Sequence, residues 1–219
     1  MIRQIDLVTD MDNYIITIAR SFGSGGKEVA SVLSEKLGIP CYERQILTMA
    51  SQASGIDESE FVEVDEKLRG SYLIKSLTKL PTTNVLRPES RAFVSELNLY
   101  NIQANIIREL AKTQSCIIVG KCADFILRDR RNVLSVFVEA YTEDCINLIR
   151  SRVYVSDERA KDMKKRTDKY RTAYYKYYTR GQKWNSPLNY DLFLNTSRLS
   201  KEQCADIISE AAKIKFNLK

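Results

Sequence analysis

The chain has 219 residues, of which 44% are hydrophobic and 28% are charged, and its formal net charge is +6. It contains no histidine, which excludes every mechanism that needs an imidazole as a base or as a metal ligand. Its five cysteines are odd in number and include no C-x-x-C pair, so neither a disulfide framework nor a zinc site is expected. No apolar run is long enough to span a bilayer and the first residues lack a secretory signal, so we expect a cytoplasmic protein.

A buried strand followed by a glycine-rich turn opens the predicted fold. Residues 14–19 form an apolar, β-branched run, and residues 21–27 follow with the sequence Ser-Phe-Gly-Ser-Gly-Gly-Lys. Apolar residues then recur at helical spacing over residues 27–37, and Gly38 and Pro40 mark the end of that helix. A strand, a glycine turn and a helix in this order are the context that a phosphate-binding P-loop requires.

The turn agrees only in part with the P-loop pattern G-x-x-x-x-G-K-[ST]. Gly26 and Lys27 match it, whereas Ser21 replaces the first glycine and Glu28 replaces the final Ser or Thr. That hydroxyl normally holds magnesium, and a carboxylate would repel phosphates unless it turns outward or joins the metal shell; Ser21 or Ser24 could substitute. Glycine amides, the helix dipole and the lysine charge still favour a bound triphosphate. We therefore expect nucleotide binding by Gly23, Ser24, Gly25, Gly26, Lys27 and Glu28.

Strand-like and helix-like segments alternate along the rest of the chain. Further strands are expected over residues 41–44, 115–120, 132–138 and 190–195. Residues 70–91 hold two prolines and several Ser and Thr, which is typical of a loop. Such alternation predicts an α/β fold with a parallel sheet and right-handed crossovers. Helices are expected over residues 43–53, 57–68, 93–112, 123–127 and 142–155. Another helix begins after a cap at Ser156 or Asp157, and the last one spans 201–216 after a cap at Ser200.

Positive charge is concentrated in one segment, from Arg150 to Lys183. This segment has 12 Lys or Arg against 4 Asp or Glu and six of the 12 tyrosines, whereas the rest of the chain has 22 basic and 24 acidic residues. On a helix, a cationic face that closes over ATP would neutralise charge on the transferring phosphoryl group. A solvated helix, or nucleic-acid binding through phosphate contacts and stacking, are the alternatives, although no recognised nucleic-acid motif is present. Helical spacing of 4, 3 and 4 places on one face Lys164, Asp168, Arg171 and Tyr175.

Several short motifs together resemble the cytidylate kinase-like family, a branch of the nucleoside monophosphate kinases. They occur in the family's order and cover nearly the whole chain. The resemblance implies a three-layer P-loop fold with about five parallel strands, helices on both faces, and one domain over residues 1–219. It further implies an acceptor-binding region at about residues 42–112 and a basic helical lid at about 150–185. The motifs are residues 15–27, 37–42 and 117–124, Asp168-x-x-Arg171 with Tyr174-Tyr175, Trp184, and residues 190–197.

The resemblance also implies roles for individual residues. Lys27 and the turn amides would hold ATP, and Arg171 and Asp168 match lid residues at the transferring phosphates. Lys164 stands where authentic cytidylate kinases carry another lid arginine. We therefore expect a catalytic group made of Lys27, Lys164, Asp168 and Arg171.

Three residues are candidates for binding the acceptor. Lys121 falls where cytidylate kinases carry the arginine of a Gly-Arg-Asp motif that binds the acceptor, and a lysine loses the bidentate grip. Arg44 follows the second strand, where acceptor-site residues of this fold lie, although a surface position is equally consistent with its sequence context. Asp124 can pair with Lys121 or lie near the metal.

The expected function is ATP- and Mg²⁺-dependent phosphoryl transfer to a small acceptor, a nucleoside monophosphate with CMP or dCMP first. No residue is assigned as a metal ligand, no membrane contact or nucleic-acid partner is expected, and the acceptor and oligomeric state stay open. Glu28 favours one alternative, a nucleotide-binding regulator with weak or no kinase activity. The other is a nucleic-acid-binding P-loop protein.

Overall fold

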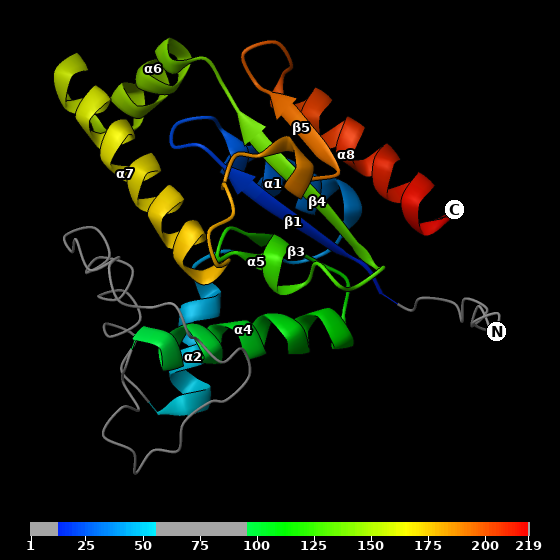
Figure 1. The fold of residues 1–219 in the computed structure, drawn as a ribbon. Helices are drawn as coiled ribbons and strands as arrows, with labels where there is room; N and C mark the ends of the chain where they lie inside the picture. Colours follow the sequence, from blue (N-terminus) through cyan, green and yellow to red (C-terminus); the bar gives the residue numbers. More distant parts are fainter. Residues whose placement is uncertain (1–12, 56–95, 219) are drawn as a thin grey trace.

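A parallel sheet forms the centre of the computed structural model, which describes residues 13–55 and 96–218 (Figure 1). Within these residues the sheet has five strands in the order β2-β3-β1-β4-β5, and all four pairings are parallel. The predicted α/β class is therefore confirmed. The strands are β1 (Ile15–Arg20), β2 (Cys41–Tyr42), β3 (Cys116–Val119), β4 (Val133–Glu139) and β5 (Leu192–Asn195).

Helices cover both faces of this sheet (Figure 1). Helices α1 (Gly26–Leu37) and α8 (Lys201–Phe216) pack against one face. The other face carries α2 (Gln45–Ser54), α4 (Glu96–Thr113), α5 (Ala123–Ile126) and α7 (Asp157–Tyr178). Helix α6 (Thr142–Val153) packs against α7, and a short 3-10 turn spans Pro187–Asn189. The helix predicted over 57–68 and the loop predicted over 70–91 lie outside the described residues.

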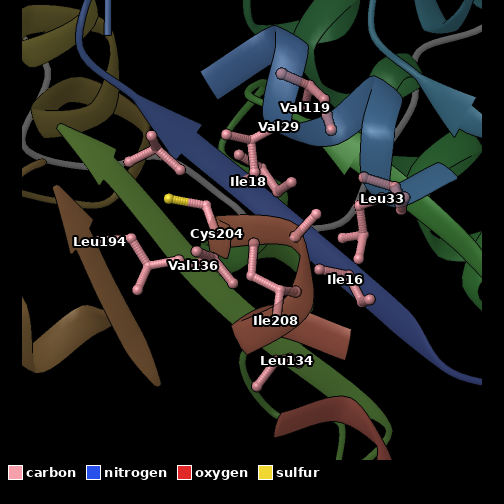
Figure 2. Packing of buried hydrophobic residues seen from close by; sticks show 14 of the residues in the cluster. Ile16, Ile18, Val29, Leu33, Val119, Leu134, Val136, Leu194, Cys204 and Ile208 are labelled. Atoms are coloured by element: carbon pink, nitrogen blue, oxygen red, sulfur yellow. The ribbon is translucent and has the colours of Figure 1, made fainter. Parts of the chain in front are cut away.

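The core beneath α1 and α8 is apolar throughout (Figure 2). Ile16 and Ile18 of β1 point to this face, and Ile15 points to the opposite one, because side chains alternate along a strand. Both faces of β1 are thus buried, which explains its near-continuous apolar sequence. Leu33 of α1 and Ile208 of α8 are fully buried against these strands. Each such side chain contributes roughly 1.5–3 kcal/mol of burial free energy.

Capping residues set several helix ends. The Ser156 hydroxyl accepts a hydrogen bond from the Arg159 amide at 3.3 Å, and Ser200 forms a capping box with Gln203, as the sequence predicts for both caps. Helix α6 ends at Val153 and not at residue 155, which corrects the prediction. The reason is local: Tyr154 adopts a left-handed conformation with φ 54°, and its amide donates to the Arg150 carbonyl to close the last turn.

Candidate functional site

The glycine-rich turn lies where β1 ends and α1 begins. Gly23 and Gly25 have φ values of 83° and 76°, in the left-handed region that favours glycine. A Cβ at Gly23 would lie 2.5 Å from the Cys145 carbonyl oxygen, and one at Gly26 would lie 2.6 Å from the Arg20 Cβ. Glycine is therefore required by close packing as well as by backbone conformation, and the turn wraps tightly around the N-terminus of α1.

Ser24 braces the turn with its side chain. Its hydroxyl is buried and donates to the carbonyl oxygens of Ser21 and Val138, at 2.9 and 3.1 Å. The Thr196 hydroxyl in turn donates to the Ser24 carbonyl oxygen at 2.6 Å. These bonds tie the turn to the ends of β4 and β5. The Ser24 hydroxyl thus has a structural role here, and the Ser21 side chain is also buried.

Glu28 forms an ion pair with Arg152 near the end of α6. Its side chain is 23% exposed and lies in the first turn of α1, where a carboxylate interacts favourably with the helix dipole. Arg152 neutralises the negative charge that the sequence places beside the phosphate-binding turn. The expected repulsion between Glu28 and a bound phosphate is reduced accordingly.

Glu43 lies directly after β2 and contacts two basic residues of the site. Each of its carboxylate oxygens forms an ion pair at 2.9 Å, Oε1 with Arg20 and Oε2 with Lys27. Burial alone would raise the pKa of Glu43, but the hydrogen bonds and charges of Lys27 and Arg20 outweigh it and hold that pKa below its usual range. Sequence reasoning placed Glu43 near the acceptor region without assigning it a role. The signal available from the sequence was its position at the end of the second predicted strand.

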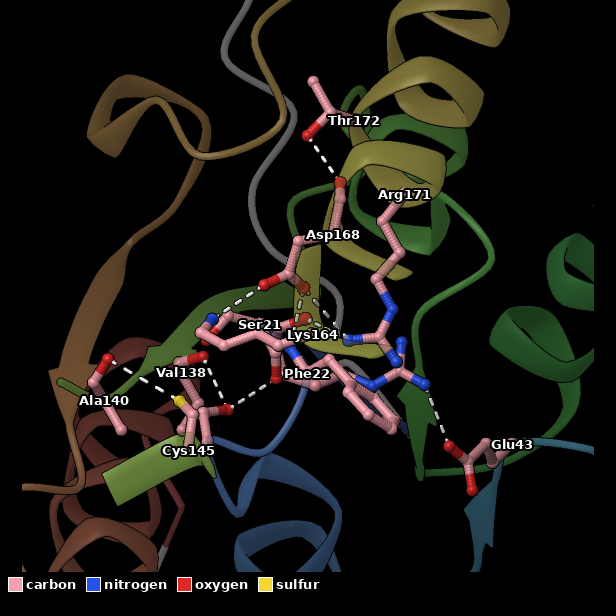
Figure 3. A network of polar contacts seen from close by, with 12 residues as sticks. Ser21, Phe22, Glu43, Val138, Ala140, Cys145, Lys164, Asp168, Arg171 and Thr172 are labelled. Carbon is pink, nitrogen blue, oxygen red and sulfur yellow. Dashed lines mark hydrogen bonds and ion pairs between the residues drawn. The ribbon is translucent and has the colours of Figure 1, made fainter. Parts of the chain in front are cut away.

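Helix α7 is docked on the glycine-rich turn through Asp168 (Figure 3). Asp168 Oδ1 accepts a hydrogen bond from the Phe22 amide at 2.7 Å, and Oδ2 accepts one from Lys164 at 2.8 Å. Arg171 donates to the Arg20 carbonyl oxygen at 2.8 Å and lies 3.9 Å from Asp168 Oδ1. The predicted face of the basic helix is therefore the face that meets the turn.

The outer face of α7 carries charges of both signs. Lys161 pairs with Asp157, and Arg159 and Arg166 both pair with Asp162. The positive excess of this segment is thus divided between residues directed at the turn and residues paired along the helix surface. Binding of nucleic acid by this segment stays an alternative that these contacts do not test.

A cavity of about 350 Å³ opens beside the turn, at the carboxyl ends of the parallel strands. Of the predicted site residues, it brings together Lys27, Arg44, Lys121, Asp124 and Arg171, whereas Asp168 contacts the turn next to it and Lys164 contacts Asp168. A cavity with several basic groups at its wall concentrates positive potential and favours anionic ligands. Its other polar and aromatic lining residues include Arg20, Glu43, Tyr170, Tyr174, Tyr175 and Trp184.

Asp124 forms the floor of this cavity together with Tyr175 of α7. The Tyr175 hydroxyl donates to Asp124 Oδ2 at 2.6 Å. Burial raises the pKa of Asp124 to about 6, and the hydrogen bond from Tyr175 opposes that rise. The sequence suggested Lys121 as a partner of Asp124, whereas the hydrogen bond found in the structure comes from Tyr175. The bond instead joins the basic helix to α5, so Asp124 also helps to place α7.

Residues 120–122, Gly-Lys-Cys, turn sharply between β3 and α5. All three have positive φ values of 77°, 57° and 53°. A left-handed conformation costs roughly 1–2 kcal/mol for a residue with a Cβ, and such strain is concentrated at functional sites. The turn carries Lys121 and Cys122 to the cavity wall.

The sheet order, the glycine-rich turn at the end of the central strand and the docked basic helix define a P-loop kinase fold. A family model described as the cytidylate kinase-like family matches residues 15–198. The chain therefore belongs to the cytidylate kinase-like family, as its motifs predict. Membership of this family supports a role in phosphoryl transfer.

Solved structures share this fold. A crystal structure of an uncharacterized protein from Eubacterium ventriosum has 25% sequence identity and a TM-score of 0.66, and the match covers 92% of this chain and 99% of that one. A shikimate kinase from Bacteroides thetaiotaomicron has 13% identity and a TM-score of 0.52 over 91% of this chain and 98% of that one, which shows the shared fold alone. A comparison with curated proteins found no match.

Two broader features of the described residues concern membranes and metals. No helix among residues 13–55 and 96–218 combines the length and apolarity needed to cross a bilayer. Within the same residues, no group of three or more Cys, Asp or Glu side chains is placed to hold a metal ion. Magnesium in kinases is usually held by one or two carboxylates, water and the nucleotide phosphates, so such a group is not required.

Proposed function

We propose that this protein transfers the γ-phosphoryl group of ATP to a small acceptor, with nucleoside monophosphates, and CMP or dCMP among them, as the first class to test. One observation carries the proposal. Basic side chains from the end of β1, the glycine-rich turn, the start of α2, the β3–α5 turn and α7 line one cavity: Arg20, Lys27, Arg44, Lys121 and Arg171. A single bound anion does not require so many cations, whereas two phosphorylated substrates do.

The triphosphate would bind at the glycine-rich turn. Lys27 would contact its β- and γ-phosphates, and the amides at the start of α1 would donate to phosphate oxygens. Magnesium, when bound with ATP, would neutralise part of the negative charge of the phosphates. The surroundings of Lys27 fit an anion, because Arg152 pairs with Glu28 and Arg20 offsets part of the negative charge of Glu43. Magnesium would therefore be bound mainly by the phosphates of ATP.

Arg171 and Lys164 would stabilise the charge that develops during transfer. Both side chains contact Asp168, and Arg171 also donates to the Arg20 carbonyl oxygen directly before the turn. Asp168 would hold them in place by its bond to the Phe22 amide. Catalysis of this kind depends on positioned charges and needs no imidazole, which agrees with the absence of histidine.

The acceptor would occupy the part of the cavity away from the turn. Arg44 and Lys121 can contact its anionic group, and Tyr170, Tyr174 and Trp184 present aromatic surface that suits a planar base. A nucleoside monophosphate combines a phosphate with such a base. This combination supports the class of acceptor and leaves the choice among bases to experiment.

Production of ADP from ATP and magnesium tests the proposal, with CMP, dCMP, UMP, AMP, GMP or no acceptor added. ADP that depends on one of these acceptors would support the proposal and identify the substrate. ADP formed equally without any acceptor would point to an ATPase. A folded protein that binds ATP but forms no ADP above the background of its Lys27→Ala variant would favour a regulator, and would overturn nucleoside monophosphates as acceptors.

A further inference from the structure

Glu43 bridges Arg20, which directly precedes the glycine-rich turn, and Lys27, the last residue of the turn. One of its carboxylate oxygens pairs with Arg20 and the other with Lys27, both at 2.9 Å. Figure 3 shows Glu43 reaching toward the turn from the chain after β2. Lys27 is also the residue that the proposed function assigns to the phosphates. A bound triphosphate and Glu43 therefore compete for the same ammonium group.

The two pairs differ in how firmly their basic partner is held. The Lys27 side chain is 70% exposed, whereas that of Arg20 is 18% exposed. The Arg20 guanidinium also packs so closely on Gly120 that a Cβ there would collide with it. Exposed ion pairs contribute only about 0–1 kcal/mol, so the Lys27 pair can be exchanged at little cost. The Arg20 pair lies in a more buried and more restricted place.

We propose that Glu43 is a positioning residue that exchanges partners during the kinase cycle. In the nucleotide-free protein it holds Lys27, and once ATP phosphates engage Lys27 it keeps Arg20 alone oriented toward the reacting groups. The proposal rests on the proposed function, because the exchange needs a phosphate ligand at Lys27. It extends that function by giving Glu43 opposite effects on ATP binding and on turnover.

The opposite effects follow from the two contacts. Before ATP binds, Lys27 must leave Glu43, so the observed affinity is reduced by the fraction of protein in which the pair is formed. A carboxylate beside the phosphates also repels them. Removal of the charge at Glu43 should therefore tighten ATP binding. Turnover should fall, because Arg20 loses a carboxylate that helps to orient its guanidinium at the cavity wall.

The test measures ATP affinity by titration calorimetry and turnover with the acceptor found in the substrate panel. For Glu43→Ala we expect the dissociation constant for Mg-ATP to fall by about 2–5-fold, as loss of a competing exposed ion pair predicts, while kcat falls by at least about tenfold. Glu43→Asp keeps the charge and should retain ATP affinity close to that of the unchanged protein. Glu35→Gln, on the exposed side of α1, makes the same change in charge away from the cavity and should alter neither quantity.

Several outcomes would overturn the inference. Unchanged or weaker ATP binding by Glu43→Ala, or an affinity change equal to that of Glu35→Gln, would show that Glu43 does not compete for Lys27. A fall in affinity and kcat together, with a lowered melting temperature, would indicate a merely structural role. Failure of the proposed function looks different, because the unchanged protein would then bind no ATP or form no acceptor-dependent ADP.

Discussion

The two ends of the cavity are built in different ways. At the glycine-rich turn, exposed or half-buried charged groups make ion pairs that a ligand can replace, as Lys27 does with Glu43. At the floor, Tyr175 and Asp124 are buried and joined by a 2.6 Å hydrogen bond, within an aromatic cluster that includes Trp184. Buried polar pairs are costly to break, whereas exposed pairs are not.

From this difference we propose that α7 acts as a lid that moves without detaching. Its C-terminal half is anchored by Tyr174, Tyr175 and Tyr178, which are buried in the aromatic cluster. Its middle meets the turn through polar contacts of Asp168 and Arg171, and Phe22 of the turn packs in an apolar cluster with Ala160 of the same helix. We expect motion of this helix to change the polar contacts first and to leave the aromatic anchor in place.

The largest effect is expected at the exchangeable end, from Lys27→Ala. Loss of this charge removes the main contact to the β- and γ-phosphates, so ATP affinity and turnover should both fall, with kcat reduced by about 10²–10³-fold or more. Calorimetry and the ADP assay measure the two quantities. Activity retained within a few-fold would mean that the turn does not hold the transferring phosphates.

Arg171→Ala should separate binding from catalysis. The guanidinium contacts the Arg20 carbonyl oxygen and Asp168 beside the turn, so its loss should reduce kcat by about 10²-fold. ATP affinity measured without acceptor should change by less than about threefold, because Lys27 and the turn remain. Equal losses in affinity and kcat would contradict the assignment of Arg171 to the transition state. Arg166→Ala, whose side chain is directed to solvent and pairs with Asp162, is the matched control.

The floor of the cavity should respond mainly in stability and pH dependence, which Asp124→Asn tests. Burial raises the pKa of Asp124 to about 6 from an ordinary value of 3.8, so the folded state binds more protons than the unfolded state between these values. The free energy of unfolding should therefore fall as pH rises from about 4 to about 6, by up to about 3 kcal/mol. Asn keeps an acceptor for the Tyr175 hydroxyl and carries no charge.

Asp124→Asn should accordingly remove this pH dependence and raise stability at pH 7. Urea denaturation at pH 4, 5, 6 and 7 measures the effect in both proteins. Parallel curves across this range would show that Asp124 ionises as freely as it does in water. Exchange of the exposed Asp129 for Asn provides a control for the general loss of one negative charge.

The smallest effect is expected from Glu28→Gln. Arg152 already neutralises this carboxylate, so loss of its charge should change the affinity for Mg-ATP by less than about threefold. A large gain in affinity would mean that Glu28 repels the phosphates despite Arg152. A large loss that raised magnesium concentrations restore would instead place Glu28 in the metal shell.

Local sequence patterns were sufficient for the elements around the site. Apolar β-branched runs predicted β1, β3 and β4, and caps were predicted at Ser200 and at Ser156 or Asp157, because these preferences arise within a few residues of chain. The end of α6 was predicted two residues too late, since the left-handed turn at Tyr154 has no glycine to mark it. The helical spacing of Lys164, Asp168 and Arg171 correctly predicted a shared face.

The sequence by itself determined the class of fold, the glycine-rich turn and the segment that carries the positive charge, because each depends on neighbours along the chain. Only the tertiary structure decided the partners of the charged groups. Glu28 pairs with Arg152, Glu43 with Arg20 and Lys27, and Asp124 with Tyr175. These contacts join residues that are far apart in sequence, and parallel strand order brings them to one edge of the sheet. Charge type can be read from a sequence, whereas the choice of counter-ion follows from packing in three dimensions.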